Sequence, residues 1–165
     1  MNGKRPEENY DKISSGLKPK QARIFLKNKN KKIIIMEYIR QFIEWTKLKI
    51  RIHLSPEKEL YFHEREIWWA SLGVNIGFEQ DGKNETFERP ILIIKKFNKY
   101  VLWALPLTSK ERIGKYYYQT EYQGEKSVII LSQLRLISSK RLIRKVRKLP
   151  SKEFREIKDI LKSFL

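Results

Sequence analysis

The sequence has no cysteine and only two histidines in 165 residues. Without cysteine, disulfides, thiolate metal sites and cysteine nucleophiles are excluded. His53 and His63 have no acidic neighbours at a metal-ligand spacing, so we assign both to the surface. A glycine-rich phosphate-binding loop is also missing. We therefore expect no bound metal and no other cofactor.

Long apolar runs are missing too. No stretch approaches the roughly 20 apolar residues that a membrane-spanning helix needs. The charged N-terminus, with Lys4, Arg5, Glu7 and Glu8, is not followed by an apolar stretch of signal-peptide length. We expect a soluble, cytoplasmic protein without a membrane partner, which agrees with the lack of cysteine.

Acidic residues are scarce relative to basic ones. The chain has 36 Lys and Arg against 19 Asp and Glu, a formal net charge of +17. Residues 1–62 hold 15 basic and 7 acidic residues, and residues 63–165 hold the remaining 21 and 12, so the excess is spread along the chain. Such a charge favours a polyanionic partner, RNA or DNA. The alternative is a compositional bias of the genome.

The first 62 residues read as a basic, partly helical extension. Residues 1–20 are polar, hold two glycines and two prolines, and are expected to be mobile. From Ile33 to Arg51, apolar residues recur at helical spacing. Phe42 and Trp45 lie on this stripe, which favours a helix docked on the following domain. The alternative is a basic amphipathic helix that contacts nucleic acid or a partner.

Residues 63–165 have the pattern of a mainly β domain. Short apolar segments predict strands at 67–72, 90–94, 100–105, 116–122, 127–131 and 134–137. A long polar loop, 73–88, separates the first two. One helical turn is expected at 138–142, and a last helix is expected with Ser151 as its N-cap. This order predicts a mainly β (α+β) fold, a small antiparallel barrel closed by a helix.

Four blocks in this domain together resemble the MazF/PemK family of toxins. The first runs from Glu66 to Gly73 and continues as Gly77-Phe78-Glu79-Gln80, the second is Arg89-Pro90 before an apolar strand, the third is 104–109 ending in Thr108-Ser109, and the fourth runs from Ser127 to Arg135 and is followed by Arg141-Leu142. Each block alone is weak. Their common order over roughly 100 residues is specific, while residues 1–62 lie outside the resemblance.

The resemblance implies an SH3-like barrel of the MazF/PemK/CcdB type that forms a homodimer. It also implies a metal-independent, sequence-selective endoribonuclease that cleaves single-stranded RNA by attack of the ribose 2′-hydroxyl on the neighbouring phosphate. The chain would then belong to a type II toxin–antitoxin system, with an antitoxin protein that blocks the groove. The family's catalytic pair falls on Arg89 and Thr108.

The chemistry of these two residues suits that reaction. The Arg89 guanidinium offers a fork of donors to phosphate oxygens, and such donors stabilise developing charge. The Thr108 hydroxyl can hold a phosphate oxygen or orient the nucleophile. From the residues alone, Arg89 could equally form a surface ion pair with Glu85 or Glu88, and Thr108 could simply cap a turn.

A second set of residues is expected to contact the RNA. It comprises Glu79, Gln80, Ser109, Ser127, Gln133 and Arg135. Ser132 stands where some relatives have an acid, and the loop up to Arg89 is longer and more acidic than is usual for the family. The competing hypotheses are a barrel that binds RNA or DNA without cutting it and, by fold analogy alone, a poison directed at a topoisomerase.

Overall fold

The computed structural model describes residues 19–57 and 59–164, with the backbone alone considered for residues 19–32. It begins with a 36-residue helix, α2 (Pro19–Leu54). The described residues up to Ile43 belong to one unit, and those from Glu44 onward belong to a second compact unit that includes the last turns of α2. Trp45 is buried as the sequence predicts, whereas Phe42 is 39% exposed.

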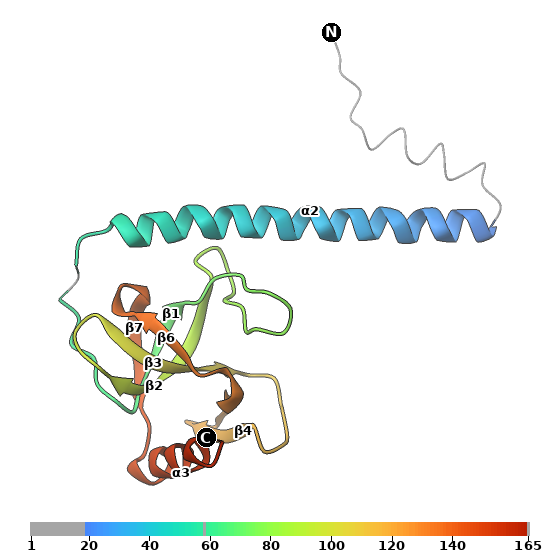
Figure 1. Ribbon diagram of the computed structural model, residues 1–165. Coiled ribbons are helices and arrows are strands. Elements are labelled where there is room, and N and C mark those ends of the chain that lie inside the picture. Colours follow the sequence, from blue (N-terminus) through green and yellow to red (C-terminus); the bar gives the residue numbers. More distant parts are fainter. Residues whose placement is uncertain (1–18, 58, 165) are drawn as a thin grey trace. The chain divides into compact units, whose positions relative to one another are not determined.

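The second unit is built around a curled antiparallel sheet (Figure 1). Its strands are β1 (Glu66–Ser71), β2 (Glu88–Lys96), β3 (Val101–Thr108), β4 (Tyr117–Tyr122), β5 (Glu125–Ile130), β6 (Arg135–Ser138) and β7 (Leu142–Lys148). The strand order is β4-β5-β3-β2-β1-β7, and β6 pairs with β3. Two single 3-10 turns, η1 (Leu131–Gln133) and η2 (Ser139–Arg141), lie on either side of β6. The mainly β prediction is confirmed.

Strand β2 lies between two cores, which explains its nearly continuous apolar sequence. Ile91 and Ile93 face a cluster with Phe62 and Trp68, whereas Leu92 and Ile94 face a second cluster. Successive side chains of a strand point to opposite faces, so both faces of β2 must be apolar to be buried.

The C-terminal helix α3 (Ser151–Lys162) covers the second core with Phe154 and Ile157. It lies beside β4 (Figure 1), where Glu153 accepts a hydrogen bond from Thr120 at 2.7 Å. Ser151 is not its N-cap: that position belongs to Pro150, and no side chain caps the helix. Ser151 therefore lies one residue inside the helix.

Strand β7 was not predicted from the sequence. It carries four basic residues, and most of its side chains are exposed, so it lacks the alternation that marks a half-buried strand. Its position comes from backbone pairing with β1 at the sheet edge. No helix in the described part of the chain is long and apolar enough to cross a membrane.

Candidate active site

Arg89 lies near the start of β2 and is only 6% exposed. Its Nε donates to the carbonyl of Asp81, and its Nη1 donates to the carbonyl of Leu107 at 2.9 Å. Glu88 forms its ion pair with Arg144 at 2.8 Å and not with Arg89. Two backbone carbonyls thus hold the guanidinium in one orientation.

Burial lowers the pKa of Arg89, the carboxylate of Asp81 raises it, and the positive charge of Arg135 lowers it further. The net direction is downward from the ordinary pKa of an arginine side chain. An arginine nevertheless stays protonated in proteins at neutral pH. Arg89 is therefore a nearly buried cation whose charge is stabilised by carbonyl dipoles and by one nearby carboxylate.

Thr108 is the last residue of β3 and is 8% exposed. The antiparallel register pairs Ile91 with Pro106, so the start of β2 and the end of β3 meet at the same side of the sheet. Arg89 bonds to the carbonyl immediately before Thr108. The structure therefore brings the predicted pair together, although Thr108 also caps a turn by accepting from the amide of Lys110 at 3.2 Å.

Gln133 connects η1 to the β1–β2 loop, residues 72–87. Its Oε1 accepts from the amide of Gln80 at 2.7 Å, and its Nε2 donates to the carbonyl of Phe78 at 2.9 Å. Both polar atoms of this amide bond to the loop backbone, so Gln133 positions the loop and retains one N–H and one oxygen lone pair for a further contact. Glu79, between the two anchored residues, is exposed.

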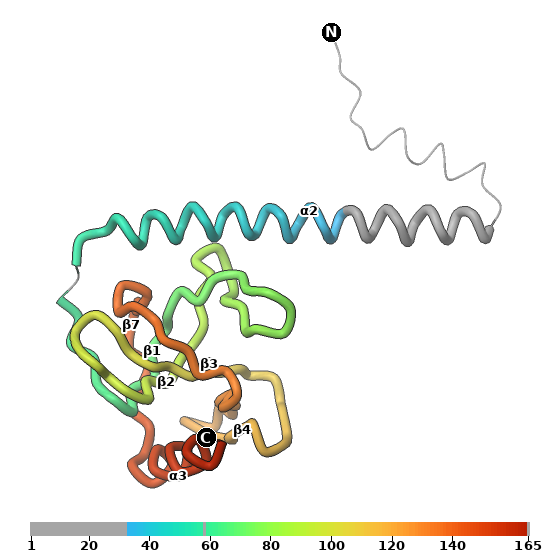
Figure 2. The backbone as a smooth tube through the Cα atoms, viewed as in Figure 1, coloured from blue at the N-terminus to red at the C-terminus, as the bar shows by residue number. Residues whose placement is uncertain are grey.

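The β1–β2 loop, drawn in green in Figure 2, is folded on itself. The amide of Asn75 donates to the Asp81 carboxylate at 2.6 Å, and its side chain donates to the Gln80 carbonyl at 3.0 Å. The amide of Gly82 donates to the Gly73 carbonyl at 2.7 Å. A Cβ on Gly82 would lie 1.7 Å from the carbonyl oxygen of Phe87, so no side chain fits there.

The remaining residues predicted to contact RNA lie after β3, in β5 and in β6. Ser109 is exposed directly after β3, and Ser127 is half-buried in β5 beside Val128, which pairs with Thr108. Arg135 is half-buried at the start of β6.

Arg141, which the sequence analysis did not select as a site residue, belongs to the same basic group. Its pKa is lowered by burial and then by Arg135, and it donates to the Ser71 carbonyl at 3.1 Å. Arg89, Arg135 and Arg141 thus form a basic cluster. The Arg141-Leu142 pair that follows the fourth block is the signal that could have indicated it.

The described residues contain no group of three or more His, Asp and Glu side chains placed to hold a metal ion. A separate apolar hollow of about 650 Å³ lies between β3, η1 and α3, lined by Trp103, Tyr116, Ser132, Leu134 and Phe164 among others. None of the residues of the predicted catalytic pair lines it.

Comparisons with known proteins agree with the predicted family. The model of the PemK-like, MazF-like toxin of type II toxin–antitoxin systems matches residues 63–165. The structure is similar to MazF from Deinococcus radiodurans, with 18% identity, a TM-score of 0.53 and coverage of 64% of this chain and 97% of that one. At that identity the similarity shows the fold alone, and it confirms the predicted fold class.

A second similar structure is an endoribonuclease in complex with its cognate antitoxin from a mycobacterial species. It has 10% identity and a TM-score of 0.47, and it covers 62% of this chain and 93% of that one. Among curated proteins, none matches the sequence.

Proposed function

This chain belongs to the family of PemK-like, MazF-like toxins of type II toxin–antitoxin systems, and we propose that it is an endoribonuclease that cleaves single-stranded RNA. The observation that carries the proposal is the orientation of Arg89. A nearly buried guanidinium, held by two carbonyls beside Thr108, is a preorganised site for a phosphate group. Donors fixed in advance stabilise developing charge more than mobile ones.

The proposed reaction is an internal transesterification. The ribose 2′-oxygen forms a bond to phosphorus, and the bond from phosphorus to the 5′-oxygen breaks, which leaves a 2′,3′-cyclic phosphate and a 5′-hydroxyl. The 2′-hydroxyl loses one proton and the leaving 5′-oxygen gains one. Arg89 neutralises the charge that develops on the phosphoryl oxygens, and the Thr108 hydroxyl orients one of them. No metal is required in this proposal.

The basic cluster fits the rest of the substrate. Arg135 adds positive charge next to Arg89, and Arg141 adds more next to Arg135, where neighbouring phosphates of the strand would bind. Glu79 and Gln80 belong to the loop that Gln133 holds, so in the proposed complex they border the bound strand together with Ser109 and Ser127.

The partners follow from the family and from charge. We propose an antitoxin protein with an acidic segment, because the chain carries a net charge of +17. We also propose a homodimer, which analytical ultracentrifugation of the purified chain can test. A neighbouring short reading frame for an acidic protein would support the antitoxin.

The deciding experiment incubates the protein with a long single-stranded RNA in excess EDTA and maps the fragment ends. Arg89→Ala is the test variant. Arg155→Ala, an exposed arginine on α3, is the matched control. Discrete fragments with cyclic phosphate ends, made by the control and not by Arg89→Ala, support the nuclease. RNA that stays intact but is retarded on a gel favours a barrel that binds nucleic acid without cutting it.

A further inference from the structure

The β1–β2 loop has its base at Phe87. The carbonyl of Phe87 accepts from the amide of Leu72 at 2.9 Å and from that of Gly73 at 3.4 Å. The same loop presents the Asp81 carbonyl to Arg89. A displacement of Phe87 would therefore be transmitted along a short stretch of loop backbone to the Asp81 carbonyl, and from there to the Arg89 guanidinium.

Trp45 of α2 fills a socket at this base, formed by Gly73, Val74, Phe87 and Arg141. The indole is 5% exposed, and its ring centroid lies 5.7 Å from that of Phe87. A Cβ on Gly73 would come within 2.1 Å of the indole, so the indole occupies the space a side chain at that position would need.

Arg141 covers the indole from another side. Its guanidinium lies 5.2 Å from the ring centroid, which is the geometry of a cation–π contact. The same guanidinium donates to the carbonyl of Ser71 at the end of β1. Trp45 thus contacts both ends of the loop and one member of the basic cluster.

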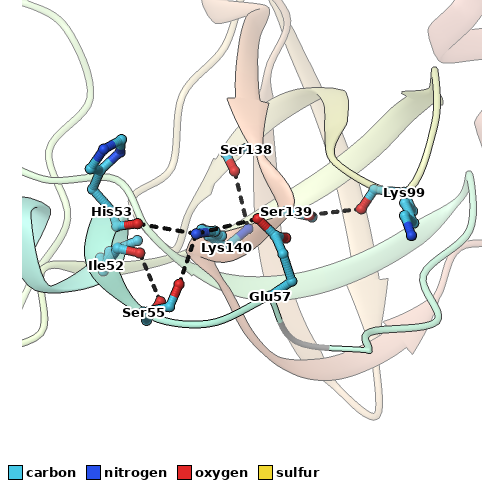
Figure 3. A network of polar contacts seen from close by, with 8 residues as sticks. All are labelled: Ile52, His53, Ser55, Glu57, Lys99, Ser138, Ser139 and Lys140. Atoms are coloured by element: carbon cyan, nitrogen blue, oxygen red, sulfur yellow. Dashed lines mark hydrogen bonds and ion pairs between the residues drawn. The ribbon is translucent and has the colours of Figure 1, made fainter.

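The segment that carries Trp45 contacts the barrel a second time at its C-terminal end, through Lys140 (Figure 3). Lys140 Nζ donates to the carbonyls of His53 at 3.1 Å and Ser55 at 2.8 Å, and it forms an ion pair with Glu57 at 3.3 Å. Lys140 is itself fixed in η2, where its amide donates to Ser138. The last turns of α2 are therefore fixed to the barrel at Trp45 and at Lys140.

The family match begins only at residue 63, so neither Trp45 nor the segment to Glu57 is part of it. We propose that residues 45–57 are a positioning element of the active site, in which Trp45 sets the β1–β2 loop so that the Asp81 carbonyl holds Arg89 in its reactive orientation. This proposal rests on the proposed nuclease function. Trp45 is a positioning residue: it acts through the loop and does not touch the RNA.

The experiment compares Trp45→Ala with the wild-type protein in steady-state cleavage and in amide hydrogen exchange over residues 72–87. We expect kcat to fall at least tenfold, with KM changed less than threefold, because Arg135 and other surface cations still bind the strand. Exchange of the Gly82 and Leu72 amides should become faster. Tyr61→Ala, which removes an 80% exposed aromatic from the same extension, should leave both readouts unchanged.

Trp45→Phe keeps an aromatic ring in the socket and should recover most of kcat. Lys140→Ala removes the contacts of Lys140 with His53, Ser55 and Glu57 and leaves the Trp45 indole in its socket. It therefore serves as the test variant if Trp45→Ala does not fold. We expect it to lower kcat by a smaller factor and to speed exchange in the same loop. A Trp45→Ala or Lys140→Ala protein that is folded and cleaves at the wild-type kcat overturns the proposal.

The two proposals fail in different ways. If the wild-type protein does not cleave RNA, the proposed function fails, and loop exchange alone then decides whether Trp45 positions the loop. If the wild type cleaves and Trp45→Ala exchanges like the wild type in residues 72–87, the nuclease stands and the positioning role is wrong.

Discussion

Arg89 donates a 2.9 Å hydrogen bond from Nη1 to the carbonyl of Leu107, eighteen residues away, directly before Thr108. This bond, from a side chain to a backbone carbonyl, joins the start of β2 to the end of β3. The Asp81 carbonyl binds Nε of the same guanidinium from the β1–β2 loop. Three segments of the chain therefore meet at a single cation.

Arg89→Lys should abolish most of the activity although it keeps the positive charge. A lysine has one ammonium group on a flexible stem and cannot bond to both carbonyls while it presents donors to a phosphate. Loss of one preorganised donor typically costs about 10²–10³ in rate. Single-turnover cleavage measures this, with Arg155→Lys as the matched control on exposed surface. Near wild-type cleavage by Arg89→Lys would show that charge alone suffices at this position.

Gln133→Ala should loosen the β1–β2 loop, with a smaller effect on the free energy of unfolding of the whole protein. The change removes two hydrogen bonds to backbone, which together contribute about 1–3 kcal/mol. We expect the amide of Gln80 to exchange faster and cleavage to slow. Ser132→Ala, at the exposed neighbouring position, is the control. Unchanged exchange at Gln80 would mean that the contacts within the loop are sufficient to order it.

Glu66 makes folding stability depend on pH in the acid range. Burial would raise the pKa of this carboxyl, but hydrogen bonds from Lys145, Trp68 and the His63 amide outweigh burial, and the net shift is downward from 4.5. A carboxyl with a lowered folded pKa stabilises the protein above its unfolded pKa. That stability is lost as the pH falls through the folded pKa.

Glu66→Gln should therefore lower the free energy of unfolding by about 1–3 kcal/mol at pH 7, because it weakens charge-assisted hydrogen bonds at a buried position. The difference from wild type should shrink below about pH 4, as both side chains become neutral. Urea denaturation across this pH range measures it, with the exposed Glu125→Gln as control. A difference that is the same at pH 3 and pH 7 would contradict the role of the charge.

Arg135→Ala should weaken RNA binding and reduce its dependence on salt. If Arg135 contacts one phosphate, the slope of log K against log salt should become shallower by about one. Filter binding of a non-cleavable single strand at several salt concentrations gives this slope, and Arg155→Ala should leave it unchanged. A slope equal to that of the wild type would place Arg135 outside the RNA path.

The apolar run in β2 and the order of the four blocks were sufficient to predict the mainly β fold and the family, because these signals are local in sequence. Arg89 and Thr108 were identified as a pair by resemblance, and the β2–β3 register explains why they meet. Their catalytic role stays a prediction. Strand β7 could not be predicted, because its charged residues form a strand only when β1 supplies the hydrogen-bonding partner.

The sequence by itself determined where the chain is apolar, where it turns and how strongly basic it is, since those properties belong to single residues and their near neighbours. Only the tertiary structure decided what Gln133, Arg141 and Trp45 do. Gln133 bonds across 53 positions to Gln80, and Trp45 fills the space that Gly73 leaves open. Such contacts depend on where the backbone brings distant segments together, and no local pattern of residues encodes them.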